Sequence, residues 1–260
     1  MSVIIATYNW SSVLRYAIQT ALWQTYGNIE LLVIGDACTD DSEQVVASFA
    51  DARVRWHNLP ANCGNQFGPN NAGLGLARGE YVAYLGHDDV WFPTHLAWLM
   101  MAVTETGALL AHTRSEWIGP NGSYRAYGYN VIPPSAILHE TGLGREIGWR
   151  DYRELVEGPD RDFIRRATAR SGMLEVPVLT VFKFPSAWRK NSYIEKPSHE
   201  QAAYVRRIEC ERDFIDNELA ALRKAELDGT FPGFGFEADR PNPVPPGWFV
   251  TQLRKARGLE

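Results

Sequence analysis

The stretch EYVAYLGHDDVW, residues 80–91, decides the fold that we predict for this chain. Its apolar and aromatic run, residues 81–85, is typical of a strand buried on both faces in the middle of a sheet. His87, Asp88 and Asp89 follow directly. Two neighbouring carboxylates at the end of a buried strand disfavour each other's ionisation unless a positive group lies near them. A bound divalent cation would supply that charge, and a solvated turn whose Asp caps the next helix is the alternative.

Composition and charge narrow the class of protein. At 260 residues, with 45% hydrophobic and 22% charged residues, the chain suits one large α/β domain or a domain with an extension. A net charge of −5 argues against a nucleic-acid partner.

Three cysteines without CxxC spacing predict neither a disulfide framework nor a zinc module, and they favour a reducing cytoplasm. The longest apolar run, residues 96–103, is too short to span a bilayer and no charged leader precedes the first strand, so we expect a cytoplasmic protein. Peripheral contact with a membrane and a homo-oligomer both remain open.

The order of predicted elements indicates an open parallel sheet. Apolar strands and amphipathic helices alternate, which predicts parallel strands joined by right-handed crossovers in a Rossmann-like α/β fold. Asp40 and Glu43 have the spacing of a capping box, and the Asn- and Gly-rich residues 62–69 are expected to form a loop. The predicted strands are residues 2–7, 30–34, 53–57, 81–85 and 109–117, and the predicted helices are residues 12–22, 41–49, 71–78 and 92–106.

Polar side chains follow three of these strands. In an open parallel sheet the loops after the strands meet at one edge, where ligands bind. A Tyr there can stack on a base, an Asp can accept a hydrogen bond from a base or ribose, and carboxylates can hold a metal that bridges phosphates. No GxGxxG or P-loop motif is present. The chain therefore predicts a nucleotide and metal site made by Thr7, Tyr8 and Asn9, by Asp36, and by Asp88 and Asp89.

The same segments resemble family 2 glycosyltransferases of the GT-A fold. SVIIATYNW, LLVIGDACTDDS and NCGNQFGPNNAGLGLARGEYVAYLGHDD are similar, in order and spacing over about the first 90 residues, to the family's PTYN, DDGSTD and NxGxxxARG…DxD patterns. The chain departs from them at Gly35, which replaces the first acid of DDGSTD, at Asn70, where an Arg is common, and at His87, which replaces the first Asp of DxD.

This resemblance implies a role for each matching residue. Thr7 and Tyr8 would line the nucleotide, Asp36 would contact the base, and Asp89 would bind Mn²⁺ or Mg²⁺ through the diphosphate, with Asp88 beside it. We add Asn9 and Asn71 to the nucleotide-sugar set. His87 is either a further metal ligand or a solvated loop residue.

The second half contains one informative segment, EGPDRDFIRRA, which is similar to the family's GEDxDLxxR pattern with Pro159 in place of Glu. By that resemblance Asp160 is the catalytic base that deprotonates the acceptor hydroxyl, and Glu157 is a neighbouring candidate. The alternative is that Asp160 caps a helix over residues 161–169. Residues 176–184 are predicted as an edge strand, because they contain Pro177.

We therefore expect three portions: residues 1–118 for the donor, 119–198 for the acceptor and the base, and 199–260 as a helix and a Pro-, Gly- and aromatic-rich tail. The predicted activity is that of an inverting hexosyltransferase that moves a sugar from a nucleoside diphosphate sugar, by expectation a UDP-sugar, to a saccharide or lipid-linked saccharide. A sugar nucleotidyltransferase and a glycosyltransferase-fold binding protein without catalysis are the alternatives.

Overall fold

The computed structural model describes residues 1–122, 125–127, 131–195, 200–225 and 239–260. These residues form a nine-stranded mixed sheet in the order β3-β2-β1-β4-β8-β6-β9-β5, with β7 paired to β6. The strands are β1 (Ser2–Thr7), β2 (Glu30–Gly35), β3 (Val54–Asn58), β4 (Tyr81–Gly86), β5 (Val90–Trp91), β6 (Leu110–Ile118), β7 (Arg125–Tyr127), β8 (Ile137–Glu140) and β9 (Leu174–Lys183).

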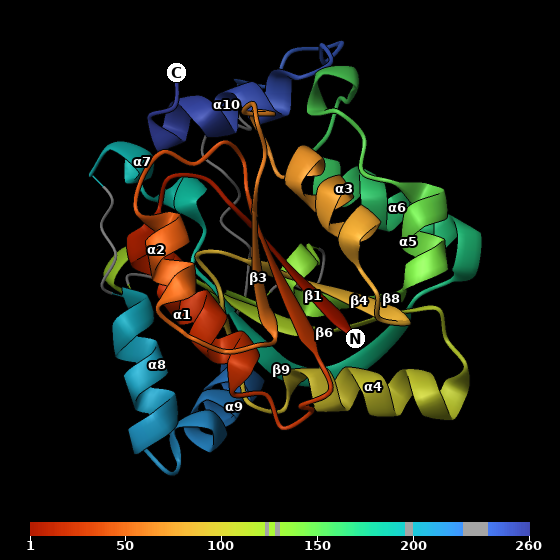
Figure 1. Ribbon diagram of the computed structural model, residues 1–260, viewed down its shortest axis with the longest axis vertical. Coiled ribbons are helices and arrows are strands. Elements are labelled where there is room, and N and C mark those ends of the chain that lie inside the picture. Colours follow the sequence, from red (N-terminus) through yellow and green to blue (C-terminus); the bar gives the residue numbers. More distant parts are fainter. Residues whose placement is uncertain (123–124, 128–130, 196–199, 226–238) are drawn as a thin grey trace.

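Helices cover both faces of this sheet (Figure 1). The helices are α1 (Ser11–Leu22), α2 (Ser42–Ala47), α3 (Phe67–Leu76), α4 (His95–Thr106), α5 (Thr141–Ile147), α6 (Pro159–Ser171), α7 (Ser192–Glu195), α8 (Glu200–Cys210), α9 (Phe214–Ala225) and α10 (Trp248–Arg257). Four short 3-10 turns join them, at Pro120–Gly122, Pro134–Ala136, Tyr152–Glu154 and Ser186–Trp188.

Two apolar cores follow from this layering. Alternate residues of β1, Val3 and Ile5, pack with α1, α2 and α4 on one face. Ile4 packs with α3, α5 and α6 on the other. Because both faces of the central strands are covered, these strands are apolar at nearly every position, which is the pattern that predicted them. A third, smaller cluster joins β5 and β9 to α8 and α9.

The strand register brings the predicted loops together. β1 pairs in parallel with β2 and β4, so that Thr7 lies opposite Gly35 and Ala6 opposite Gly86. The carboxyl ends of these three strands are therefore level, and the loops that follow them meet at one edge. The predicted α/β class with a Rossmann-like, mainly parallel sheet is confirmed, with β8 running antiparallel between β4 and β6.

Several predicted boundaries were wrong. Helix α3 begins at Phe67, inside the predicted loop. Pro69 in its first turn does not prevent this, because the backbone amides of the first turn have no intrahelical acceptor and a proline there loses no hydrogen bond. The Asp40 carboxylate accepts from the amide and hydroxyl of Ser42 and does not form the predicted capping box. Helix α4 starts at His95 rather than residue 92, because Val90–Trp91 forms β5.

The predicted edge strand is also corrected, because β9 lies between β6 and β5. Pro177 is tolerated there because the pairing of β9 with β6 is irregular between Glu175 and Leu179. The predicted carboxyl-terminal helix is divided into α8 and α9, and α8 begins at Glu200. The first eight residues of the predicted tail, 231–238, and His199 lie outside the described residues.

Candidate functional site

A cavity of about 590 Å³ lies at the carboxyl edge of β1, β2 and β4. Most of the predicted site residues line it: Thr7, Tyr8, Asp36, His87, Asp88, Asp89 and Asp160. The cavity is of the size that small-molecule and cofactor sites have. The sheet edge and the first turn of α6, which are far apart in the sequence, therefore face one space.

Asn9 and Asn71 lie outside the lining of this cavity. The Asn9 side chain accepts hydrogen bonds from the amides of Thr39, at 2.7 Å, and Asp40, at 3.3 Å, and so joins the loops after β1 and β2. Asn71 exchanges two hydrogen bonds with the backbone of Trp149, through its amide nitrogen at 2.8 Å and its oxygen at 2.9 Å. Both amides thus hold loops that border the cavity.

Asp36 is held at the end of the cavity next to β1 and β2 by the loop before α3. The residue is 4% exposed, and its carboxylate accepts hydrogen bonds from the amides of Cys63, at 2.8 Å, and Gly64, at 3.2 Å. Burial raises the pKa of Asp36 against the opposing effect of these hydrogen bonds. The aromatic ring of Tyr8 lines the same end.

Gly35 has a steric reason to be glycine. A Cβ at this position would lie 2.5 Å from Oδ1 of Asn58 and 2.6 Å from the ring of Trp56, both on β3. The Asn58 side chain in turn binds the backbone of Cys38 at 2.8 and 2.9 Å. The side chains of β3 therefore fill the space that a side chain at position 35 would need.

Asp89 is fully buried, and several donors converge on its carboxylate. Oδ2 accepts from the Ser135 hydroxyl at 2.5 Å and from Nζ of Lys183 at 3.0 Å. Oδ1 accepts from Nζ of Lys183 and from the amide of Phe184, both at 3.3 Å. Burial alone would lower the pKa of Lys183, but the charges of Asp89 and Asp88 outweigh it and raise that pKa. The ammonium group therefore stays protonated and neutralises Asp89.

His87 is buried and both of its ring nitrogens have hydroxyl partners. Nδ1 lies 2.9 Å from Oγ1 of Thr7, and Nε2 lies 3.1 Å from the hydroxyl of Tyr193. The ring also meets Trp10 edge-on. Burial lowers the pKa of His87, so the imidazole is neutral and bridges two hydroxyl groups. Its position differs from the solvated loop that we considered from the sequence.

Asp88 has the freer carboxylate of the acidic pair. Its backbone carbonyl accepts from Gln201, and no side-chain hydrogen bond reaches its carboxylate from the part of the chain that the structure describes. Among these same residues no three His, Cys, Asp or Glu side chains gather as metal ligands. Since Asp89 and His87 are engaged by other groups, the predicted ligand set does not fit a metal centre built by the protein.

Asp160 stands in the first turn of α6, which begins at Pro159 with Gly158 as the N-cap residue. Asp160 thus does not cap the helix. Its carboxylate accepts only the amide of Arg161, at 3.0 Å, from the described residues. Glu157, the neighbouring candidate, is paired with Arg165 at 3.0 Å. Of the two acids, Asp160 has the carboxylate that is free to accept a proton from a molecule in the cavity.

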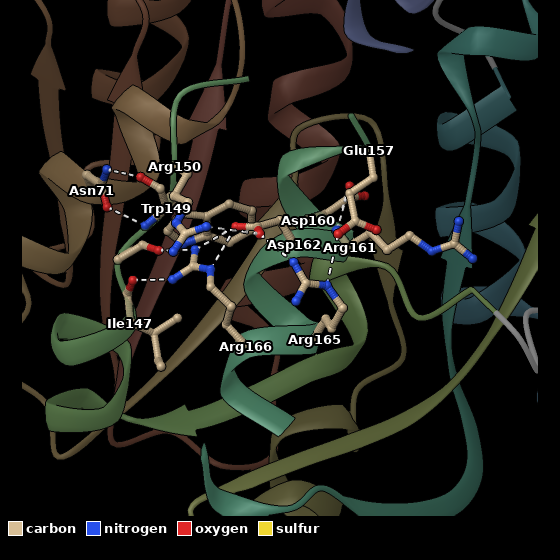
Figure 2. Close-up of polar contacts among 11 residues, drawn as sticks. Asn71, Ile147, Trp149, Arg150, Glu157, Asp160, Arg161, Asp162, Arg165 and Arg166 are labelled. Carbon is tan, nitrogen blue, oxygen red and sulfur yellow. Dashed lines mark hydrogen bonds and ion pairs between the residues drawn. The ribbon is translucent and has the colours of Figure 1, made fainter. Parts of the chain in front are cut away.

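A buried ion pair fixes the start of α6 (Figure 2). Asp162 is 0% exposed and pairs with Arg165 at 2.9 Å and Arg166 at 2.7 Å. Arg166 also donates to the carbonyls of Ile147 and Gly148 at the end of α5. These contacts join α5 to α6, and they hold the turn that carries Asp160.

Trp149 extends this support toward α3. Its ring stacks on Phe163 with centroids 4.6 Å apart, and its indole nitrogen donates to the hydroxyl of Tyr84 at 3.0 Å. Its backbone is the group that Asn71 holds. Helix α3, strand β4 and helix α6 are therefore connected through one tryptophan.

Helix α10 forms the roof of the cavity, across the top of Figure 1. Arg254 donates to the carbonyl of Gly64 at 2.7 Å, Gly247 donates to Leu155, and Asn191 donates to Ala256. Trp248, Phe249 and Arg257 of this helix line the cavity. The end of the chain thus borders the site with two arginines and two aromatic rings.

The sequence analysis missed Lys183, Ser135, Tyr193 and the α10 residues. Lys183 had a usable signal, because a single lysine in the apolar strand VLTVFKF must find a partner when that strand is buried. Ser135 lies in a three-residue 3-10 turn and Tyr193 in the four-residue helix α7, and both elements are too short to show a periodic pattern. None of the described helices is long and apolar enough to cross a membrane.

Comparison with known sequences identifies the family. The sequence model described as "Glycosyl transferase family 2" matches residues 2–164. The chain is 35% identical over 98 residues to the Escherichia coli UDP-Glc:alpha-D-GlcNAc-diphosphoundecaprenol beta-1,3-glucosyltransferase WfaP, a match that covers 37% of this chain and 38% of that protein. An uncharacterized glycosyltransferase of Rickettsia prowazekii is 35% identical over 96 residues, covering 37% of this chain and 29% of that protein. The matches thus span well under half of these relatives.

Solved structures agree on the fold. Residues 1–349 of S. aureus TarS in complex with UDP-GlcNAc superpose with a TM-score of 0.61 at 16% identity, over 88% of this chain and 76% of that one. Mannosyltransferase PcManGT from Pyrobaculum calidifontis, in complex with GDP-Man and Mn²⁺, gives 0.59 at 15% identity, over 98% and 85%. The sheet, the level strand ends and these superpositions show the predicted GT-A fold, and the chain belongs to glycosyltransferase family 2.

Proposed function

We propose that this protein transfers a sugar from a nucleoside diphosphate sugar to an acceptor hydroxyl, with inversion at the anomeric carbon and Asp160 as the general base. One observation carries the proposal: the free carboxylate of Asp160 faces the same cavity as Thr7, Tyr8 and Asp36 at the strand ends. A donor bound along the sheet edge and an acceptor next to α6 would then meet in one enclosed space.

The donor in this proposal is a UDP-sugar. TarS, which shares the fold, is known in complex with UDP and with UDP-GlcNAc, and the Escherichia coli relative is named for a UDP-Glc donor. Tyr8 would stack on the base and the Asp36 carboxylate would accept a hydrogen bond from it. The acceptor would be a saccharide or a lipid-linked saccharide, as that relative's name suggests. The three cysteines are free, which supports the reducing cytoplasm as the compartment.

The proposed step needs one base and one leaving group. The acceptor oxygen attacks the anomeric carbon as Asp160 accepts its proton, and the bond from that carbon to the β-phosphate oxygen breaks, releasing the nucleoside diphosphate. The buried Asp162 and Arg166 pair would hold Asp160 in place during attack. A Mn²⁺ or Mg²⁺ ion, which the sequence resemblance implies, would find one free carboxylate, Asp88, and no step above depends on it.

Asp160→Asn tests the assignment of the base. The amide keeps the shape of the side chain but cannot accept the proton, so transfer should fall by about 10²- to 10⁴-fold. Binding of UDP, measured as a rise in melting temperature, should remain because Asp160 does not contact the nucleotide in this proposal. Glu157→Gln is the matched control, since Glu157 is paired with Arg165 and should leave transfer within a few-fold of the natural protein.

Three results would contradict parts of this proposal. Undiminished transfer by Asp160→Asn would remove Asp160 from the role of base. If UDP, GDP, dTDP and CDP all fail to raise the melting temperature of the natural protein, with or without Mn²⁺, the nucleotide site itself would be wrong. Donor binding without transfer or hydrolysis on a broad acceptor panel would favour the binding-protein alternative.

A further inference from the structure

Lys183 is the cation that the sequence analysis did not consider. Its Nζ binds both carboxylate oxygens of Asp89, and its side chain keeps 19% of its surface exposed, in the lining of the cavity. The Trp117 ring lies 5.7 Å from the ammonium group. The carboxylates of Asp88 and Asp160 also act on its charge. Lys183 therefore joins the buried carboxylate of Asp89 to the lining of the cavity.

Asp89 would need to lose several of its contacts before it could hold a metal ion. Ser135, Lys183 and the amide of Phe184 together direct four hydrogen bonds at its two oxygens, the usual capacity of a carboxylate. A side chain at Gly86 is also excluded, because a Cβ there would lie 2.7 Å from Oδ2 of Asp89. Both ring nitrogens of His87 are engaged by the hydroxyl groups of Thr7 and Tyr193. The geometry thus leaves Asp88 as a single free ligand beside a resident ammonium group.

We propose that Lys183 supplies, from the protein itself, the positive charge that faces the donor diphosphate, so that nucleotide binding does not require a divalent cation. This inference rests on the proposed function, because it assumes that a nucleoside diphosphate occupies the cavity. An ammonium group has three protons, and two directed at Asp89 leave one for a phosphate oxygen. In the enclosed cavity such a contact is a charge-assisted hydrogen bond to a group that gains charge as the sugar leaves.

The first experiment compares UDP with uridine on the metal-free natural protein. With EDTA present, UDP should bind with an affinity within about tenfold of that in Mn²⁺, measured by calorimetry. Lys183→Met should weaken binding of UDP by about 10- to 100-fold, the usual strength of a charge-assisted hydrogen bond, while uridine, which has no phosphate, binds as before. Lys190→Met, at an exposed lysine of the following segment, should change neither affinity.

A double variant distinguishes the proposed role of Lys183 in binding the diphosphate from its role in stabilising the fold. Lys183→Met leaves Asp89 buried without its cation and could unfold the protein, whereas Lys183→Met with Asp89→Asn removes both charges and keeps an amide for Ser135 and Phe184. The double variant should bind uridine normally and UDP weakly. Normal UDP binding by the double variant, or UDP binding that needs added Mn²⁺ or Mg²⁺ in the natural protein, would overturn the proposal. Failure of the natural protein to bind either molecule in any condition would overturn the proposed function as well.

Discussion

Asp88 and Asp89 are adjacent in the chain but have different environments. The family resemblance implied that Asp89 binds the metal ion, with Asp88 beside it. In the structure, Asp89 is buried against Lys183 and Ser135, while the Asp88 carboxylate faces the cavity without a side-chain hydrogen bond from the described residues. Adjacent residues at the end of a strand point in different directions, so which of the two carboxylates stays free of hydrogen bonds depends on the turn at Gly86.

Substitution of each acid by Asn should separate these environments. Asp89→Asn leaves the Lys183 ammonium buried without a counter-charge, and we expect a loss of about 3 kcal/mol in the free energy of unfolding. Asp88→Asn removes no hydrogen bond made by the described residues to that carboxylate and should lower that free energy by at most about 1 kcal/mol, well below the loss for Asp89→Asn. Urea unfolding followed by tryptophan fluorescence measures both. Equal losses for the two variants would show that Asp88 also has a structural partner.

At the scale of elements, α3 positions the loop that holds Asp36. Gly73 faces β1, and a Cβ there would lie 2.7 Å from Cγ2 of Ile4, which is fully buried. Gly75 lies two residues further along the same helix, and a Cβ there would meet no neighbouring atom within 4 Å. The helix therefore approaches the sheet closely on one side only. The start of α3 then reaches the cavity through Gln66, Pro69 and Asn70.

Two alanine variants of α3 test this packing. Gly73→Ala should lower the free energy of unfolding by about 1–3 kcal/mol, because the methyl group overpacks against Ile4. Gly75→Ala should raise it by up to about 1 kcal/mol, because alanine has the higher helix propensity and meets no neighbour. Thermal and urea unfolding of the pair give the comparison. A stabilising Gly73→Ala would show that α3 can move away from β1 without cost.

At the scale of the whole molecule, three histidines are buried in different layers of the fold. His87 lies at the cavity, His95 contacts Thr180 at 2.7 Å, and His139 contacts Tyr84 at 3.1 Å. Burial lowers the pKa of all three, to about 3 for His95 and about 4 for His139. Each imidazole is thus neutral in the folded protein at a pH where it would be charged in the unfolded chain.

The free energy of unfolding should therefore fall with pH below about 6.5, the ordinary pKa of histidine. The unfolded chain takes up protons there that the folded protein does not, so the stability present above this pH is lost progressively toward pH 4. These three groups contribute at most about 4 kcal/mol per pH unit to the slope, and His112, whose pKa burial also lowers, adds in the same direction. Urea unfolding at a series of pH values measures it.

Two histidine variants check the origin of the slope. His139→Gln should flatten it by up to about 1.4 kcal/mol per pH unit, since one buried imidazole is removed. His57→Gln, at an exposed histidine, should leave it unchanged. A natural protein whose stability does not change between about pH 6.5 and pH 5 would contradict the assignment of these imidazoles as neutral and buried.

The sequence by itself determined the class of fold, the central strands and the edge where the loops meet, because a strand covered on both faces must be apolar along its whole length. Most of the site residues that it predicted also line the cavity. Only the tertiary structure decided which carboxylate is free, that Lys183 lies beside Asp89, and that α10 forms the roof. These contacts join residues far apart in the chain, such as Asp89 and Lys183, which are 94 positions apart, and local periodicity cannot specify them. They depend instead on how β9 and the end of the chain pack against the strand edge, where burial gives each charge its partner.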